Sequence, residues 1–211
     1  MASVTLRGNP CNLSGNMPGI GDSAPDFKLV KADLSNVDLA SLAGKTKVIV
    51  TVPSLDTPVC QTETRKFNEK AAALGNVEVL IVSADLPFAQ KRFCETEGLK
   101  SVTACSDLRD RTFGERYGVR IADGPLEGVM ARAVFVVDAN DKVRYSELVG
   151  EIAKNAPEAM QMTKRLLNET IGEALFSQLA AGAAVSATSR TTEAAAEGLA
   201  AFLEKREPKW S

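Results

Sequence analysis

The chain alternates short apolar runs with longer segments in which apolar residues recur every three or four positions. Short runs rich in valine and isoleucine are typical of strands that are buried on both faces of a sheet. We expect such strands at 48–52, 77–83, 101–106 and 131–137, with an outer strand at 142–146. The segments between them predict helices at 61–74, 88–97 and 109–117. This alternation predicts an α/β fold, a sheet with helices on each side.

The first two helices carry signals for their ends. Gly75 and Gly98 stand just after them, where a residue with positive φ often ends a helix. Asp85 precedes the second helix and is a candidate N-cap, because its carboxylate can accept a backbone N–H.

The two ends of the chain have different patterns. Residues 4–13 alternate around Gly8-Asn9, which predicts an N-terminal β-hairpin that contains Cys11. An amphipathic helix is expected at 158–169. Residues 169–211 are rich in alanine, with two helix-like halves that either dock on the body or on a second subunit, or form a frayed tail. The chain therefore divides into a domain at 1–168 and a helical C-terminal extension at 169–211.

Composition limits the classes of function. The chain has 211 residues, 45% of them apolar, and a net charge of −2 with acidic and basic residues interspersed, so it can bury a core, and no nucleic-acid partner is expected. No apolar run approaches the roughly 20 residues that span a bilayer. The first residues lack the charged and apolar parts of a secretory signal, so a cytoplasmic protein without a membrane partner is expected.

The chain contains no histidine. This excludes Ser–His and Cys–His relays and metal sites with histidine ligands. The four cysteines are Cys11, Cys60, Cys94 and Cys105, and no two form C-x-x-C, so we expect neither a zinc knuckle nor a thioredoxin-type dithiol. Cys105 is expected to be structural, on a buried strand.

Cys60 stands where the strand at 48–52 is followed by a helix. Because the first N–H groups of a helix are unpaired and its dipole is positive there, a thiol at such a site loses its proton more easily. The thiolate is the nucleophile. The alternative for Cys60 is a small buried hydrophobe, a common role of a single cysteine.

Three residues around this point form the pattern P-x-x-x-T-x-x-C, namely Pro53, Thr57 and Cys60. The Thr57 hydroxyl could hydrogen-bond both the thiolate and an incoming oxygen donor, or serve as a helix N-cap. Pro53 ends the strand, because it has no N–H, and could shield the thiolate and stiffen the loop.

Two arginines are candidates to hold the Cys60 sulfur as a thiolate. Arg132 opens the apolar strand 131–137, and a guanidinium there needs an anionic partner or an exposed end. If this strand lies beside the one that leads to Cys60, Arg132 could stabilise the thiolate and polarise a peroxide. The alternative is a surface salt bridge. Arg65, one turn into the helix, is the weaker candidate.

Cys94 lies in a separate helix. It could pair with Cys60 only if the two Cα atoms came within about 7 Å, which predicts local unwinding of its helix. The alternative is that Cys94 is inert and buried.

Residues 54–60 (SLDTPVC) and 83–94 (SADLPFAQKRFC), with 122–126 and 131–133, resemble the thiol peroxidase subgroup of the peroxiredoxins. The resemblance covers about residues 3–167. It implies a thioredoxin-like fold with a central mixed sheet, no cofactor, a homodimer and reduction by thioredoxin or a similar dithiol. It also implies that Cys60 is the peroxidatic and Cys94 the resolving cysteine, and that Pro53, Thr57 and Arg132 belong to the active site.

The reaction that follows is reduction of hydrogen peroxide and organic hydroperoxides through a Cys60 sulfenic acid, which Cys94 converts to a disulfide. One alternative is a peroxide-sensing redox relay with little steady-state turnover. Another is a non-enzymatic interaction module that binds through its C-terminal segment. Steady-state peroxide consumption distinguishes the first, and deletion of 172–211 the second.

Overall fold

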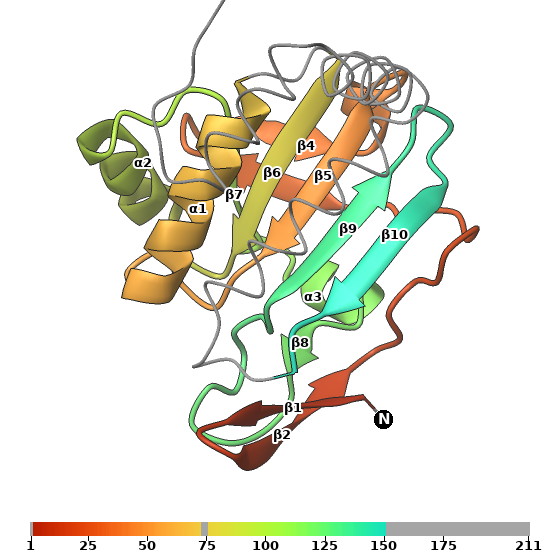
Figure 1. Ribbon diagram of the computed structural model, residues 1–211, viewed down its shortest axis with the longest axis vertical. Helices are drawn as coiled ribbons and strands as arrows, with labels where there is room; N and C mark the ends of the chain where they lie inside the picture. Colours follow the sequence, from red (N-terminus) through yellow and green to blue (C-terminus); the bar gives the residue numbers. More distant parts are fainter. Residues whose placement is uncertain (1, 73–75, 151–211) are drawn as a thin grey trace, which may run out of the picture. The chain divides into compact units, whose positions relative to one another are not determined.

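The structure is a computed structural model that describes residues 2–72 and 76–150 (Figure 1). Its main feature is a sheet of seven strands in the order β10-β9-β5-β6-β7-β3-β4. In chain order the strands are β3 (Lys28–Lys31), β4 (Asn36–Asp38), β5 (Thr46–Thr51), β6 (Val77–Ser83), β7 (Thr103–Ser106), β9 (Ala133–Val137) and β10 (Val143–Leu148). A short 3₁₀ helix, η1 (Ala40–Leu42), follows β4.

The sheet is mixed, and its centre is parallel. β5, β6 and β7 run parallel, whereas β9 pairs antiparallel with β5 on one side and β3 antiparallel with β7 on the other. All five residues of β9 are buried. The continuous apolar runs of the sequence therefore correspond to strands covered on both faces, as predicted.

Helices cover both faces. α1 (Pro58–Ala71) and α2 (Pro87–Thr96) contribute Cys60, Phe67 and Phe93 to the core on one face, packed with alternate residues of the central strands. α3 (Phe113–Arg116) contributes Phe113 to the core on the other face, where the ring of Tyr117 stacks on it. Figure 1 shows α1 and α2 next to each other, with α3 behind the sheet.

The predicted N-terminal hairpin is present as β1 (Ser3–Leu6) and β2 (Asn9–Ser14). Its turn is Arg7-Gly8 and not Gly8-Asn9, because both Arg7 and Gly8 have positive φ, as the tight turn of a two-residue hairpin requires. A third strand, β8 (Arg120–Ile121), pairs with β2 and lies just after the helix expected at 109–117. Cys11 is buried in this small sheet.

Two helix boundaries differ from the prediction. α1 begins at Pro58, which suits the first helical position because its missing N–H is not needed there, so Cys60 lies inside the first turn. The helix expected at 109–117 is reduced to the four residues of α3. Between β7 and α3 the chain is held by Asp107, whose carboxylate accepts the N–H groups of Phe113 and Gly114.

α1 ends at Ala71 with Ala72 as its C-cap, a few residues before the predicted end at Gly75, which itself lies outside the described residues. The helix at 158–169 and the extension at 169–211 also lie outside them. The boundary between the 1–168 domain and the extension stays a prediction for the same reason. Within 2–72 and 76–150, no helix is long and apolar enough to span a membrane.

Candidate active site

Cys60 lies at the edge of the sheet where the parallel strands end. β5 stops at Thr51, residues 52–57 form a connecting loop, and Thr57 is the N-cap of α1. The Cys60 side chain is 1% exposed, in the first turn of the helix. The N–H groups of that turn have no partner within the helix, and the positive end of the helix dipole lies there, so the local field favours an anionic sulfur.

The Arg132 guanidinium contacts this sulfur directly. Its Nη2 donates a hydrogen bond to Cys60 Sγ at 3.2 Å, and the Arg132 side chain is 1% exposed. The pairing of β9 with β5 produces this contact, since Thr51 faces Ala133 in the register and Arg132 therefore lies beside the loop that leads to Cys60. The alternative of a surface salt bridge is wrong, because the arginine is buried.

Glu63 completes this group and was not found by the sequence analysis. Its carboxylate forms an ion pair with Nη1 of Arg132, and both side chains are 1% exposed. Glu63 follows Cys60 by three positions on α1, so both project from the same face of the helix. A carboxylate three positions from a cysteine, on a helix face expected to be buried, is the signal that could have identified it.

The guanidinium is thus held between a carboxylate and a sulfur. A planar guanidinium donates from several N–H groups in fixed directions, so the contact with Glu63 orients the N–H that points at Cys60. Its buried charge has an ionic partner, as a buried charge requires. The arrangement can stabilise a thiolate and also negative charge on an oxygen that approaches the sulfur.

Thr57 and Pro53 lie on the loop that precedes Cys60. Thr57 occupies the N-cap position, but its hydroxyl donates to the Ser54 carbonyl at 3.1 Å and makes no side-chain capping bond. Its backbone carbonyl instead accepts the N–H of Gln61 at 3.0 Å. Pro53 is buried at the start of the loop, after the last residues of β5. Both residues therefore belong to the connecting loop that leads from β5 to Cys60.

Asp85 fixes this loop from the neighbouring strand. Its carboxylate accepts hydrogen bonds from Ser54 Oγ at 2.8 Å, from Leu55 N at 2.7 Å and from Ser83 Oγ at 2.8 Å. The prediction that Asp85 caps the second helix is therefore wrong: the N-cap of α2 is Leu86, with no side-chain cap. The carboxylate is used by the loop before Cys60, which lies beside it because β5 and β6 are paired.

Cys94 lies near the C-terminal end of α2 and is half-buried. It packs against the same core cluster that contains Cys60, and both cysteines are free thiols. Desolvation raises the pKa of the Cys94 thiol, and the nearby carboxylate of Glu95 adds to the increase. The two sulfurs therefore share a region of the molecule but are not bonded.

Two further expectations have clear outcomes. Cys105 is fully buried on β7, as expected, and burial raises the pKa of its thiol. Arg65, the weaker candidate for the thiolate partner, instead makes two hydrogen bonds to the carboxylate of Glu97, at 2.6 and 2.8 Å. That assignment is therefore wrong, because the face of α1 that carries Arg65 is turned toward the end of α2.

With this geometry in place, the chain can be compared with known proteins. The Redoxin family matches residues 20–162. A thiol peroxidase of Leptospira interrogans is 56% identical over 154 residues, which cover 72% of this chain and 90% of that protein. A thiol peroxidase of Halalkalibacterium halodurans is 54% identical over 158 residues, covering 75% and 93%. A peroxiredoxin-like protein from Aquifex aeolicus has a crystal structure with a TM-score of 0.72 and 48% identity, covering 79% of this chain and 98% of that one, and confirms the predicted thioredoxin-like fold.

Proposed function

Because the chain belongs to the Redoxin family, and within it to the thiol peroxidase subgroup of the peroxiredoxins, we propose that its peroxidase reaction runs through Cys60 as the peroxidatic cysteine. The chain is a thiol-dependent peroxidase, and the proposal concerns the residues and the steps. The observation that carries it is the 3.2 Å hydrogen bond from Arg132 to the Cys60 sulfur at the start of a helix.

In the first step the Cys60 thiolate attacks the terminal oxygen of a hydroperoxide. The S–O bond forms as the O–O bond breaks, the sulfur is oxidised to a sulfenic acid, and the peroxide is reduced to water or an alcohol once the leaving oxygen takes up a proton. Arg132 stabilises the negative charge that develops on the departing oxygen, with Glu63 holding its guanidinium in place. Thr57 positions the peroxide, and Pro53 shields the sulfur from water.

In the second step the Cys94 sulfur attacks the sulfenic acid of the same chain. An S–S bond forms, the S–O bond breaks and water leaves, which gives a Cys60–Cys94 disulfide. In the third step thioredoxin or a similar dithiol reduces this disulfide by exchange and becomes oxidised itself. Hydrogen peroxide and organic hydroperoxides are the proposed substrates. A homodimer in the cytoplasm remains our expectation for the assembly and its location.

The test compares single cysteine variants in a coupled assay with thioredoxin. Cys60→Ser should lower peroxide consumption by at least about a thousandfold, because the nucleophile is lost. Cys94→Ser should reduce one equivalent of peroxide and then stop. Cys11→Ala, which changes a cysteine of the small sheet, is the matched control and should keep normal turnover.

Mass mapping of the oxidised wild-type chain should find Cys60 linked to Cys94. Normal turnover in Cys60→Ser would contradict the assignment of Cys60 as the peroxidatic cysteine. Formation of the disulfide without appreciable steady-state turnover would instead favour the peroxide-sensing relay.

A further inference from the structure

The helices that carry the two cysteines run side by side in the same direction. Asp85, just before α2, contacts the loop just before α1. Further along, Arg92 Nη2 lies 3.9 Å from a carboxylate oxygen of Asp56, and Glu97 at the end of α2 meets Arg65 in the second turn of α1. Figure 1 shows the two helices as neighbours on one face of the sheet. Movement of Cys94 toward Cys60 therefore takes place between helices that are joined at several levels.

The two ends of α2 are held by different kinds of contact. At the start, Asp85 accepts three hydrogen bonds from the chain around it, and Pro87 is buried. At the end, Arg65 Nε donates to Glu97 Oε2 at 2.6 Å and Nη2 donates to Oε1 at 2.8 Å. The Arg65 and Glu97 side chains are 39% and 27% exposed, so solvent and salt reach this ion pair. The end of α2 is thus the end that opens more easily.

Cys94 belongs to the end that the ion pair holds. Its carbonyl accepts the N–H of Leu99 at 2.9 Å, and the Glu95 carbonyl accepts the N–H of Gly98 at 3.3 Å. Gly98 has a φ of +64°, and the two bonds together form a Schellman cap on the helix. Glu97 is the residue between the last helical turn and Gly98. To leave the helix, Cys94 must break this cap, and the cap is fixed in place by the contact of Glu97 with α1.

The chain beyond the cap is also attached to α1. Asn68 Oδ1 accepts the N–H groups of Lys100 and Ser101, at 3.0 and 2.8 Å. Hydrogen bonds therefore hold both ends of the stretch between Asp85 and Lys100. Within that stretch, the Arg65–Glu97 pair is the shorter of the two ion pairs with α1 or the loop before it, since the Arg92–Asp56 pair is longer and both of its side chains are largely exposed.

We propose that the Arg65–Glu97 ion pair is a latch that sets how fast Cys94 reaches the oxidised Cys60. The proposal rests on the disulfide proposed above, in which Cys60–SOH and Cys94–SH form an S–S bond and release water. An S–S bond of about 2.05 Å requires the two free thiols to approach, and the latch must open before the last turn of α2 can do so. Arg65 and Glu97 are positioning residues: they act through the helix that carries Cys94.

The experiment measures disulfide formation after one equivalent of hydrogen peroxide, by rapid quenching with an alkylating reagent and mass spectrometry. Glu97→Gln and Arg65→Gln should each accelerate the step about two- to fivefold, the range expected when an exposed ion pair is removed. The double variant Arg65→Glu/Glu97→Arg should return the rate toward that of wild type. Added salt up to about 0.5 M should accelerate wild type and leave Glu97→Gln nearly unchanged.

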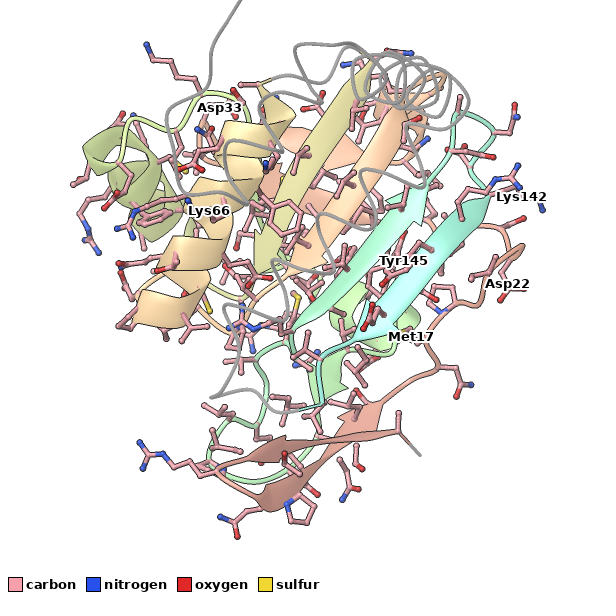
Figure 2. All side chains as sticks on the ribbon, in the orientation of Figure 1. Met17, Asp22, Asp33, Lys66, Lys142 and Tyr145 are labelled. Carbon is pink, nitrogen blue, oxygen red and sulfur yellow. The ribbon has the colours of Figure 1, made fainter. Side chains whose placement is uncertain are left out.

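The matched control is Glu69→Gln. Glu69 forms an exposed ion pair with Lys66, also on α1, and Figure 2 labels Lys66 on that helix. This variant removes one carboxylate of the same kind without changing a contact with α2, so its rate should equal that of wild type. The first oxidation of Cys60, followed in a Cys94→Ser background, should be the same in all variants.

The outcomes separate the two proposals. If oxidised wild-type protein contains no Cys60–Cys94 disulfide, the proposed function fails. If the disulfide forms at the same rate in wild type, Glu97→Gln and Glu69→Gln, the latch alone is overturned. A slower rate in Glu97→Gln would also overturn it, because the pair would then align Cys94 for attack.

Discussion

The two cysteines of the proposed reaction lie in opposite electrostatic surroundings. Cys60 is 1% exposed, accepts a hydrogen bond from the Arg132 guanidinium and lies at the positive end of a helix. Cys94 is half-buried near the other end of a helix, where desolvation and the Glu95 carboxylate raise the pKa of its thiol. The nearest charges therefore differ in sign at the two cysteines: a guanidinium contacts Cys60, whereas a carboxylate lies near Cys94.

This electrostatic difference is consistent with the different roles proposed for the two cysteines. A thiolate that is held in place can attack a peroxide directly, whereas a thiol that stays protonated at neutral pH does not compete for the same peroxide. Cys94 also lies in the capped last turn of α2. Cys60 instead contacts Arg132, which Glu63 holds, and follows the loop that Asp85 holds. The proposed nucleophile is thus held by a buried contact, and the proposed resolving cysteine lies on the segment with the more exposed attachment.

Removing the guanidinium of Arg132, which contacts Cys60, should have the largest effect on the difference between the two cysteines. Arg132→Ala should lower peroxide consumption about a hundredfold, because a preorganised donor to the reacting atoms is lost. It should also destabilise the fold by about 3–5 kcal/mol, since Glu63 is left buried without its partner. Stopped-flow kinetics and urea unfolding measure the two effects, and alkylation of Cys60 by iodoacetamide at pH 7 should slow in parallel.

A double variant separates the two effects of Arg132. Arg132→Met combined with Glu63→Gln removes both buried charges and should recover much of the lost stability, but not the rate. If the double variant regains peroxide consumption together with stability, Arg132 acts only on the fold and the proposed role is wrong.

A second prediction uses pH to test how the raised pKa of Cys94 affects the rate of disulfide formation. Because the pKa of Cys94 is raised above that of an ordinary thiol, its thiolate is the minor form at neutral pH. Disulfide formation should then become about tenfold faster per pH unit between about pH 7 and 8.5, as the thiolate fraction grows. Glu95→Gln removes the nearby negative charge, should lower the pKa and should accelerate the step about twofold at pH 7.5. If opening of the helix equilibrates before attack, the open fraction and the thiolate fraction multiply, so both the latch and the pH change the rate. A rate that does not change with pH would show that opening alone limits the step.

The third and smallest effect concerns Asp107, a buried carboxylate that accepts backbone N–H groups. Desolvation raises the pKa of Asp107 to about 6, although its oxygens accept two backbone N–H groups at 3.3 Å. Since the pKa is higher in the folded than in the unfolded chain, this group stabilises the fold fully below about pH 4, and that contribution is lost as the pH rises through about 6. Relative to Asp107→Asn, wild type should lose about 1 kcal/mol between pH 4.5 and 7.5, after allowance for solvent screening.

Urea unfolding of both proteins at the two pH values measures this difference. Equal pH dependence in wild type and Asp107→Asn would show that another group is responsible. Glu63, which is more deeply buried than Asp107, instead has an arginine as its partner.

Much of the site could be predicted because its signals are local. The place of Cys60 between a strand and a helix follows from an apolar run, a proline and a helical period, all within a short stretch of sequence. The end of α2 at Gly98 follows from the ability of glycine to adopt positive φ. The contact of Arg132 with the sulfur could be proposed because a buried cation needs a partner, and the resemblance to a known family suggested which one.

The errors have a common physical origin. Asp85 and Arg65 were given partners near in sequence, but each uses a partner about 30 positions away, Asp85 with Leu55 and Arg65 with Glu97. Both partners lie across the α1–α2 interface. A buried polar side chain forms hydrogen bonds with whichever groups the packing places next to it. The periodicity of the sequence does not show which groups these are.

The sequence by itself determined the strands, the helix that begins near Cys60 and the absence of any histidine chemistry, because these depend on side-chain type and local backbone preference. Only the tertiary structure decided that β9 pairs with β5, that the two residues of β8 join the hairpin, and that Lys47 is fully buried against the carboxylate of Asp141. It also decided that Glu63 faces Arg132. Strand order and helix packing set these contacts, since they bring together residues far apart in the chain whose charges match only once the sheet has formed.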